Sequence, residues 1–324
     1  MNATGTSSRL VSVCLITFNQ ARFIGQALDS ILAQRTQHRI EVLVGDDAST
    51  DGTREILADY AARHPDVIKP ILRDVNIGMM HNFVDVYERC AGDYLCPLEG
   101  DDRWCSPHKV ERQVAFLEAH PDCAVCFHDT RVFHEAGAFA PHRLPGPRFP
   151  HRRTIGDAVQ GNFAQTPSIM YRHGLVPTLP GWYVELGLGD WTLLLLHAAH
   201  GYIAYLPVVM AEYRVHAAGV WSQQVPAFRL ERWIAACRRM DRVFHGRFAD
   251  EFGVQIAGYH ARLAHGMTRE RWLAHGREIG VGRLRNRSPR HFLVYHSQVL
   301  LERLRQSQAI RALHTGVKRR LRGV

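Results

Sequence analysis

The sequence predicts an α/β protein whose mostly parallel sheet is flanked by helices and followed by a helical extension. Between residues 10 and about 127, β-branched apolar segments alternate with segments of helical periodicity, which is typical of βαβ units. Hydrophobic residues make up 46% of the 324 residues, so the chain can bury a core without disulfides. We expect a first domain over residues 1–220 and a basic, mainly helical region over residues 221–324.

Each segment of this alternation has its own signature. Residues 10–17 and 40–45 are apolar runs, as expected of strands that are buried on both faces. Residues 21–34 and 53–63 place apolar side chains three and four residues apart, as on one face of a helix. The same reasoning predicts strands over residues 67–72, 93–98 and 123–127, and helices over residues 78–90 and 107–120.

The middle of the chain is less regular. Residues 134–153 are rich in Pro, Gly, His and Arg, which predicts a loop. Residues 189–199 predict a helix that begins near Asp190. The 21 residues from 191 to 211 contain no Asp, Glu, Lys or Arg, but Gly201 and Pro207 interrupt them. This pattern favours a buried helix followed by a strand over a membrane span.

The start of the chain and its cysteines bear on localisation. Residues 1–10 lack the basic start and the separate apolar core of a signal peptide. The seven cysteines form no regular framework, which favours a reducing compartment. Cys123 and Cys126 form an isolated CxxC, and packing inside a strand explains it better than zinc or redox chemistry. We expect a cytoplasmic protein, soluble or peripheral on the inner face of the membrane.

Charge is distributed unevenly along the chain. Residues 221–324 carry 21 Lys and Arg against 7 Asp and Glu, whereas residues 1–220 carry 19 against 24. A basic second part can contact an anionic lipid, a nucleic acid or an acidic partner. The basic segment 317–324 fits weak attachment to an anionic membrane surface. A solvated helical face and a frayed terminus explain the same residues equally well.

Polar clusters follow four of the predicted strands. In an open parallel sheet, ligands bind at the carboxyl ends of the strands. No GxGxxG or GxxxxGK[ST] motif is present, so neither of these phosphate-binding glycine loops is encoded. The strand-end residues are instead acids, amides and hydroxyls: Thr17 and Asn19, Asp46 and Asp47, Asn76, and the segment 99–102.

Carboxylates that are crowded at one edge repel one another unless a cation lies among them. Oxygen ligands suit Mg²⁺ or Mn²⁺, which bridge one or two carboxylates to substrate phosphates. Asp101 and Asp102 therefore indicate a metal–diphosphate site, and an Asp-rich turn that caps the next helix accounts for them equally well. For residues 46–53, capping of the next helix is compatible with a ligand role for Asp47.

Five segments together carry a family resemblance: VSVCLITFNQ, VGDDASTDGT, NIGMMHNF, AGDYLCPLEGDDRW and GLGDW. In this order and spacing, over roughly residues 9–220, the chain resembles the inverting nucleotide-sugar glycosyltransferases of family 2, which have the GT-A fold. The resemblance implies that a nucleoside-diphosphate sugar lies across the carboxyl edge of the sheet. It also implies a Mn²⁺ or Mg²⁺ ion held by the D-x-D region, which here reads E-G-D-D.

The resemblance also implies roles for individual residues. Asp47 would bind the base of the nucleotide, and Asp190 would act as the general base, with Glu185 in reserve. Asp102 would be the principal metal ligand and Asp101 would support the ribose or the metal, although the order of these two stays open. The wider set comprises Thr17, Asn19, Asp46, Asp47, Asn76 and Asp101 for the nucleotide, His216 for the metal and Arg214 for the diphosphate.

We therefore expect a metal-dependent inverting glycosyltransferase. It would move a sugar to a hydroxyl of a glycan, a lipid-linked acceptor or a small molecule, in cell-surface polysaccharide or glycoconjugate biosynthesis. Peripheral membrane contact through the basic region is expected, and a nucleic-acid partner is not. Two alternatives stay open: a sugar-nucleotide-forming nucleotidyltransferase, and a non-catalytic nucleotide- or anion-binding module. The first would need a basic glycine-rich loop after the first strand, where residues 17–23 offer only Arg22.

Overall fold

The computed structural model describes residues 8–134, 139–144, 150–216, 219 and 226–263. The chain forms two compact units, residues 1–223 and 224–324. Unit 1 contains the sheet, and unit 2 is helical where it is described. None of the helices in these ranges combines the length and the apolar character that a membrane crossing requires.

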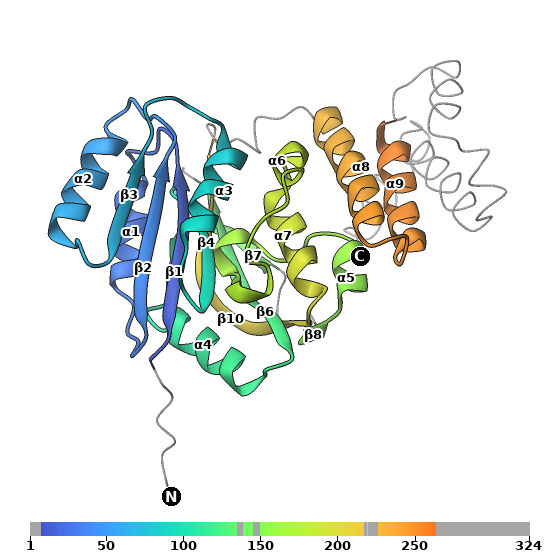
Figure 1. Ribbon diagram of the computed structural model, residues 1–324, viewed down its shortest axis with the longest axis horizontal. Helices are drawn as coiled ribbons and strands as arrows, with labels where there is room; N and C mark the ends of the chain where they lie inside the picture. The colour runs from blue at the N-terminus through green and yellow to red at the C-terminus, as the bar shows by residue number, and fades with distance from the viewer. Residues whose placement is uncertain (1–7, 135–138, 145–149, 217–218, 220–225, 264–324) are drawn as a thin grey trace, which may run out of the picture. The chain divides into compact units, whose positions relative to one another are not determined.

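Four parallel strands form the first half of the sheet in the order β3-β2-β1-β4 (Figure 1). They are β1 (Leu10–Thr17), β2 (Arg39–Asp46), β3 (Ile68–Leu72) and β4 (Tyr94–Glu99). Thr17 pairs with Asp46 and Ile16 pairs with Glu99, so the carboxyl ends of β1, β2 and β4 meet at one edge. The prediction of these strands is confirmed to within one residue at each end.

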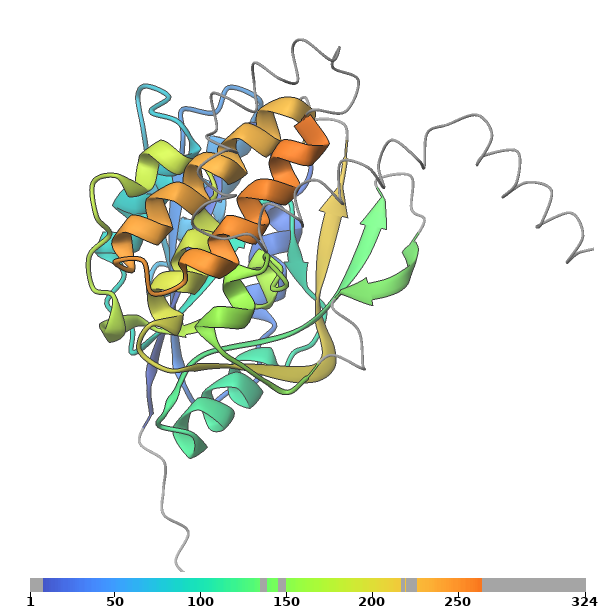
Figure 2. The same ribbon diagram turned by 90° about the vertical axis from the view of Figure 1, so that its right-hand side faces the viewer.

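The second half of the sheet mixes strand directions. It contains β5 (Arg103–Trp104), β6 (Cys123–His134), β7 (Phe139–Leu144), β8 (Arg152–Arg153), β9 (Met170–Arg172) and β10 (Tyr202–Val215). β6 and β10 are parallel, whereas the other pairs in this half are antiparallel. Figure 2 shows that β10 bends sharply, and its register with β6 shifts between Leu206 and Val209. The predicted α/β class is confirmed, and the parallel character is concentrated in the first half.

Helices cover both faces of the sheet. They are α1 (Ile24–Leu32), α2 (Thr53–Arg63), α3 (Met79–Arg89), α4 (Lys109–Ala119), α5 (Ile155–Val159), α6 (Tyr183–Leu186) and α7 (Gly189–Ala198). α1, α2 and α4 share one apolar core with the strands, to which they contribute Ile24, Leu57 and Val114. Phe83 of α3 stacks on Tyr183 of α6 at 6.2 Å, so these two helices are packed together.

Gly45 of β2 shows how closely α3 approaches the other face. Its neighbour Val44 belongs to the core under α1, so Gly45 points to the opposite side of the sheet. A Cβ at Gly45 would lie 2.4 Å from Asn82 Oδ1 and 2.5 Å from Val86 Cγ2. The Asn82 amide donates a 2.8 Å hydrogen bond to the Gly45 carbonyl. Only glycine lets α3 pack this tightly, and this packing places the start of α3 beside the end of β2.

The prediction of a loop over residues 134–153 is wrong in part. β6 extends to His134, β7 pairs with it in antiparallel register, with Leu144 opposite Thr130, and β8 pairs with β10. Strand pairing therefore overrides the local Pro- and Gly-rich composition. Residues 135–138 and 145–149 lie outside the described residues.

The fold bears on two other interpretations of the sequence. The uncharged stretch 191–211 consists of most of α7 followed by most of β10, as predicted. Cys123 and Cys126 are free, buried thiols on β6, which fits their interpretation as packing residues.

The described part of unit 2 is a pair of helices, α8 (Pro226–Val243) and α9 (Ala249–Leu263). Trp233 stacks on Tyr259 at 5.8 Å and joins them. The predicted helical character is thus confirmed for residues 226–263. Residues 264–324, including the basic segment 317–324, lie outside the described residues, and membrane contact through them stays a prediction.

Candidate active site

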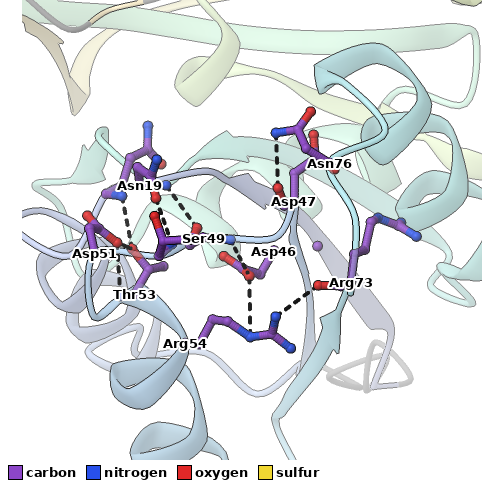
Figure 3. Close-up of polar contacts among 12 residues, drawn as sticks. Asn19, Asp46, Asp47, Ser49, Asp51, Thr53, Arg54, Arg73 and Asn76 are labelled. Atoms are coloured by element: carbon purple, nitrogen blue, oxygen red, sulfur yellow. Dashed lines mark hydrogen bonds and ion pairs between the residues drawn. The ribbon is translucent and has the colours of Figure 1, made fainter.

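Hydrogen bonds join the loop after β1 to the loop after β2 (Figure 3). Asn19 has a φ of 51°, a left-handed conformation that Asn tolerates better than most residues. Its backbone N–H donates to Ser49 Oγ at 2.8 Å, and its side-chain Oδ1 accepts from the Thr50 N–H at 2.9 Å. The two loops therefore form one hydrogen-bonded wall at the carboxyl edge of the sheet.

Asp47 joins this wall to the loop before α3. It is 2% exposed, and its two carboxylate oxygens accept the N–H groups of Ile77 at 2.8 Å and Gly78 at 2.9 Å. The Asn76 amide donates to the Asp47 carbonyl at 3.0 Å (Figure 3). A carboxylate offers about four acceptor positions, so Asp47 keeps capacity for a further donor.

Asp46 has a different environment. It is fully buried, and its Oδ2 accepts the Ser49 N–H at 3.1 Å and lies 3.9 Å from Arg54 Nε. Arg54 also donates to the Arg73 carbonyl at 2.9 Å, which links the ends of β2 and β3. This geometry favours a bracing role for Asp46 under the loop over direct contact with a nucleotide.

Replacing Asp47 with alanine is expected to lower stability as well as any nucleotide affinity. The N–H groups of Ile77 and Gly78 would lose their charged acceptor, which costs about 1–3 kcal/mol when water compensates in part. Thermal unfolding would show this cost as a lower midpoint. Asp74→Ala removes an exposed acid from the same loop and should leave the midpoint unchanged. Equal midpoints for the two variants would contradict the anchoring role of Asp47.

The acidic turn after β4 lies directly beside the first wall. Gly100 donates its N–H to the Ile16 carbonyl at 3.0 Å, and a Cβ at Gly100 would lie 2.9 Å from Thr17 Oγ1. The Asp102 N–H returns to the Glu99 carbonyl at 3.0 Å and closes the turn. Thr17, which is buried, therefore lies between this wall and the acidic turn.

The end of β10 holds the acidic turn in place. The Arg214 N–H donates to Asp102 Oδ1 at 2.8 Å, and the Arg214 guanidinium donates to the Asp101 carbonyl at 2.8 Å. His216 Nε2 lies 2.8 Å from Asp101 Oδ2. The same guanidinium donates to Gln26 at 2.9 Å and lies 4.4 Å from the ring of Phe23. These contacts favour a bracing role for Arg214 and His216 beside the acids.

Two carboxylate oxygens of the turn have no hydrogen-bond partner among the described residues. They are Asp101 Oδ1 and Asp102 Oδ2, and both atoms are buried. Burial, and then the charges of Asp101 and Glu99, raises the pKa of Asp102 well above its usual value. Within the described ranges, no three His, Cys, Asp or Glu side chains form a complete metal site. Hard, buried and unpartnered oxygens fit a divalent cation that takes its remaining ligands from substrate and water.

Asp190 shares the environment of this turn although it comes from α7. Burial, followed by the charges of Asp101 and Asp190, raises the pKa of Glu99 to about 8. Burial also raises the pKa of Tyr213 on β10, and Glu99, Asp102, Asp101 and Asp190 add to the effect in that order. Glu185, the reserve candidate for the base, is exposed on α6. The charge of Asp190 therefore reaches Glu99 of the acidic turn and Tyr213 of β10.

Two residues that contact the candidate site residues gave no signal in the sequence. Asn162 donates to Asp190, and Gln26 accepts from Arg214. In the sequence, the pair Gly161-Asn162 indicates only a turn, because no neighbouring residue shows that Asn162 contacts Asp190. Only the tertiary fold reveals these contacts.

This sheet, with acids, amides and hydroxyls at one carboxyl edge, has the α/β arrangement of the GT-A fold. The sequence profile of Glycosyl transferase family 2 matches residues 12–176. The chain therefore belongs to this family, which confirms the resemblance seen in the sequence.

Individual relatives agree with this assignment. An uncharacterized protein of Mycobacterium tuberculosis is 42% identical over 211 residues, which cover 65% of this chain and 60% of the relative. The chain thus spans well under two thirds of that protein. A Bacillus subtilis protein, named provisionally as the teichuronic acid biosynthesis glycosyltransferase TuaG, is 29% identical over 213 residues, 64% of this chain and 79% of the relative.

Solved structures show the same fold at lower sequence identity. TarS from S. aureus in complex with UDP has a TM-score of 0.59 and 16% identity, covering 90% of this chain and 88% of that one. A mannosyltransferase from Pyrobaculum calidifontis, in complex with GDP-Man and Mn²⁺, has a TM-score of 0.55 and 18% identity, covering 94% and 88%.

Proposed function

We propose that this glycosyltransferase is inverting and metal-dependent, and that it transfers a sugar from a nucleoside-diphosphate donor to an acceptor hydroxyl. The acceptor would be a glycan or lipid-linked molecule in cell-surface polysaccharide synthesis, and the teichuronic acid biosynthesis named for TuaG supports this setting. One observation carries the proposal: two buried, unpartnered carboxylate oxygens of the acidic turn lie beside the hydrogen-bonded loops after β1 and β2, and the charge of Asp190 reaches the same turn.

Asp190 is the proposed general base. In a single in-line displacement, the acceptor oxygen forms a bond to the anomeric carbon while the bond from that carbon to the diphosphate oxygen breaks. The acceptor hydroxyl must lose its proton to a carboxylate on the face opposite the leaving group. Asp190 lies in the first turn of α7 and is partly exposed, so it can contact an acceptor that arrives from solvent.

The nucleoside would lie against the wall formed by the loops after β1, β2 and β3. Asp47 is the central residue of this wall, Thr17 borders it on the side of the acidic turn, and Asn19 and Asn76 lie at its exposed margin. The related structures bind UDP and GDP-Man, which supports a nucleoside-diphosphate sugar without fixing its base.

The unpartnered oxygens of Asp101 and Asp102 would hold Mn²⁺ or Mg²⁺ together with the donor diphosphate. Such an ion stabilises the negative charge that develops on the leaving diphosphate. Arg214 and His216 would keep the two carboxylates aimed at it. The Mn²⁺ in the mannosyltransferase structure supports this choice of metal.

A donor screen tests the proposal. UDP-, GDP- and dTDP-sugars would each be incubated with the protein and Mn²⁺, and release of the nucleoside diphosphate would be measured with and without EDTA. We expect EDTA-sensitive release with one donor class. Pyrophosphate release from a sugar 1-phosphate and a nucleoside triphosphate would show a nucleotidyltransferase instead. Binding without turnover for every donor would favour the non-catalytic module.

A further inference from the structure

We infer that Asn162 is a positioning residue for the base: its side-chain amide orients the Asp190 carboxylate and keeps it ionised. The inference rests on the proposed role of Asp190. Asn162 Nδ2 donates to Asp190 Oδ2 at 2.6 Å, a short contact of the charge-assisted kind.

The orientation of the Asn162 amide is fixed from its other end. Its Oδ1 accepts the backbone N–H of Ala164 at 3.1 Å, and a backbone N–H can only donate. The oxygen must therefore face Ala164 and the NH₂ group must face Asp190. If the amide were flipped, its NH₂ group would face the N–H of Ala164, and its oxygen would face the carboxylate of Asp190.

The segment that carries Asn162 is itself held to α7. Trp191, the residue after the base, is fully buried and donates its indole N–H to the Ala158 carbonyl of α5 at 2.8 Å. α5 begins with a capping box between Thr154 and Asp157, so its start is well defined. Two contacts, Trp191 to Ala158 and Asp190 to Asn162, thus fix this segment against the start of α7.

The hydrogen bonds on Asp190 oppose the effect of its burial. Burial raises the pKa of Asp190, whereas the bonds from the Trp191 N–H, at 2.8 Å to Oδ1, and from Asn162 lower it. Among the described residues, the Asp190 charge also raises the pKa of Glu99 on β4, Tyr171 on β9, Tyr183 on α6 and Tyr213 on β10. None of these is a cation, so the amide of Asn162 is a principal source of stabilisation for the charge.

Two variants separate positioning from simple packing. Asn162→Asp keeps the size and the oxygen that accepts from Ala164, but it replaces the donor with a second carboxylate. Asn162→Ala removes the side chain. With the donor that gives turnover in the screen, we expect the acidic limb of kcat against pH to move upward by about one pH unit in Asn162→Ala. The shift should be larger in Asn162→Asp, because like charges raise the pKa of one partner. KM for the donor should stay unchanged.

A second measurement needs no donor. The side-chain ¹³C resonance of Asp190, followed through a pH titration, should show the same upward shift in both variants. Gln160→Ala removes an exposed amide from the same segment and is the control that should shift nothing. An unmoved Asp190 pKa in both Asn162 variants overturns the inference, as does an equal shift in Gln160→Ala.

The outcome is distinguishable from failure of the proposed function. Full transfer by Asp190→Asn would defeat the base assignment itself. Loss of transfer in Asp190→Asn with an unmoved acidic limb in the Asn162 variants would defeat only the role of Asn162. Because Asn162 acts through Asp190, adding Asn162→Ala to Asp190→Asn should cause no further loss of kcat.

Discussion

Replacing Asp190 with asparagine is expected to reduce sugar transfer by about 10²–10⁴-fold, the usual contribution of a general base. The amide cannot take a proton from the acceptor hydroxyl, yet it has nearly the size of the carboxylate. Its oxygen can still accept the Trp191 N–H that now binds Oδ1. The wall proposed to bind the nucleotide belongs to other loops, so the dissociation constant of the donor should change little.

Glu185→Gln is the matched control for this experiment. It removes the same charge from α6, at an exposed site that the sequence left as the reserve candidate for the base. Transfer kinetics would give kcat for both variants, and calorimetry would give donor affinity. A large loss of kcat in Glu185→Gln with normal transfer by Asp190→Asn would reverse the assignment. Equal loss of donor binding and transfer in Asp190→Asn would refute it.

The first half of the fold could be predicted because its signals are local. Strands buried on both faces read as continuous apolar runs, and β1 to β4 do so. Parallel strands joined by helices place their carboxyl ends at one edge, so the approximate position of Asp47 and Asp102 followed from topology alone. The strands in the second half of the sheet have weaker signals in the sequence, because β7 is recognisable only through its pairing with β6.

Within the site, the sequence predicted which types of residue are present, but it did not predict the contacts that each residue makes. Asp46 and Asp47 are neighbours of identical chemistry, but strand alternation sends one carboxylate under the loop and the other toward Ile77 and Gly78. The family resemblance implied that Arg214 would bind the diphosphate. Its contacts with Asp101, 113 residues away in the chain, become visible only in the fold.

Replacing Asp102 with asparagine should weaken donor binding, whereas Asp190→Asn should slow transfer and leave donor binding nearly unchanged. The new side chain can still accept the Arg214 N–H through its oxygen, but the unpartnered Oδ2 becomes an NH₂ group and the charge is lost. If Asp102 binds the metal, affinity for the donor in the presence of Mn²⁺ should fall by at least about 10–100-fold. The residual affinity should no longer respond to EDTA.

Thermal stability gives a second test of Asp102 as a metal ligand. Burial and the neighbouring acids raise the pKa of Asp102, which means that its ionised form is costly in the absence of a cation. Removing that charge should therefore leave the unfolding midpoint of the metal-free protein unchanged or raise it, whereas added Mn²⁺ should stabilise only the wild type. Asp59→Asn makes the same substitution at a side chain that is 63% exposed, and it should alter neither quantity. Donor binding by Asp102→Asn that keeps its full dependence on Mn²⁺ would exclude Asp102 as a metal ligand.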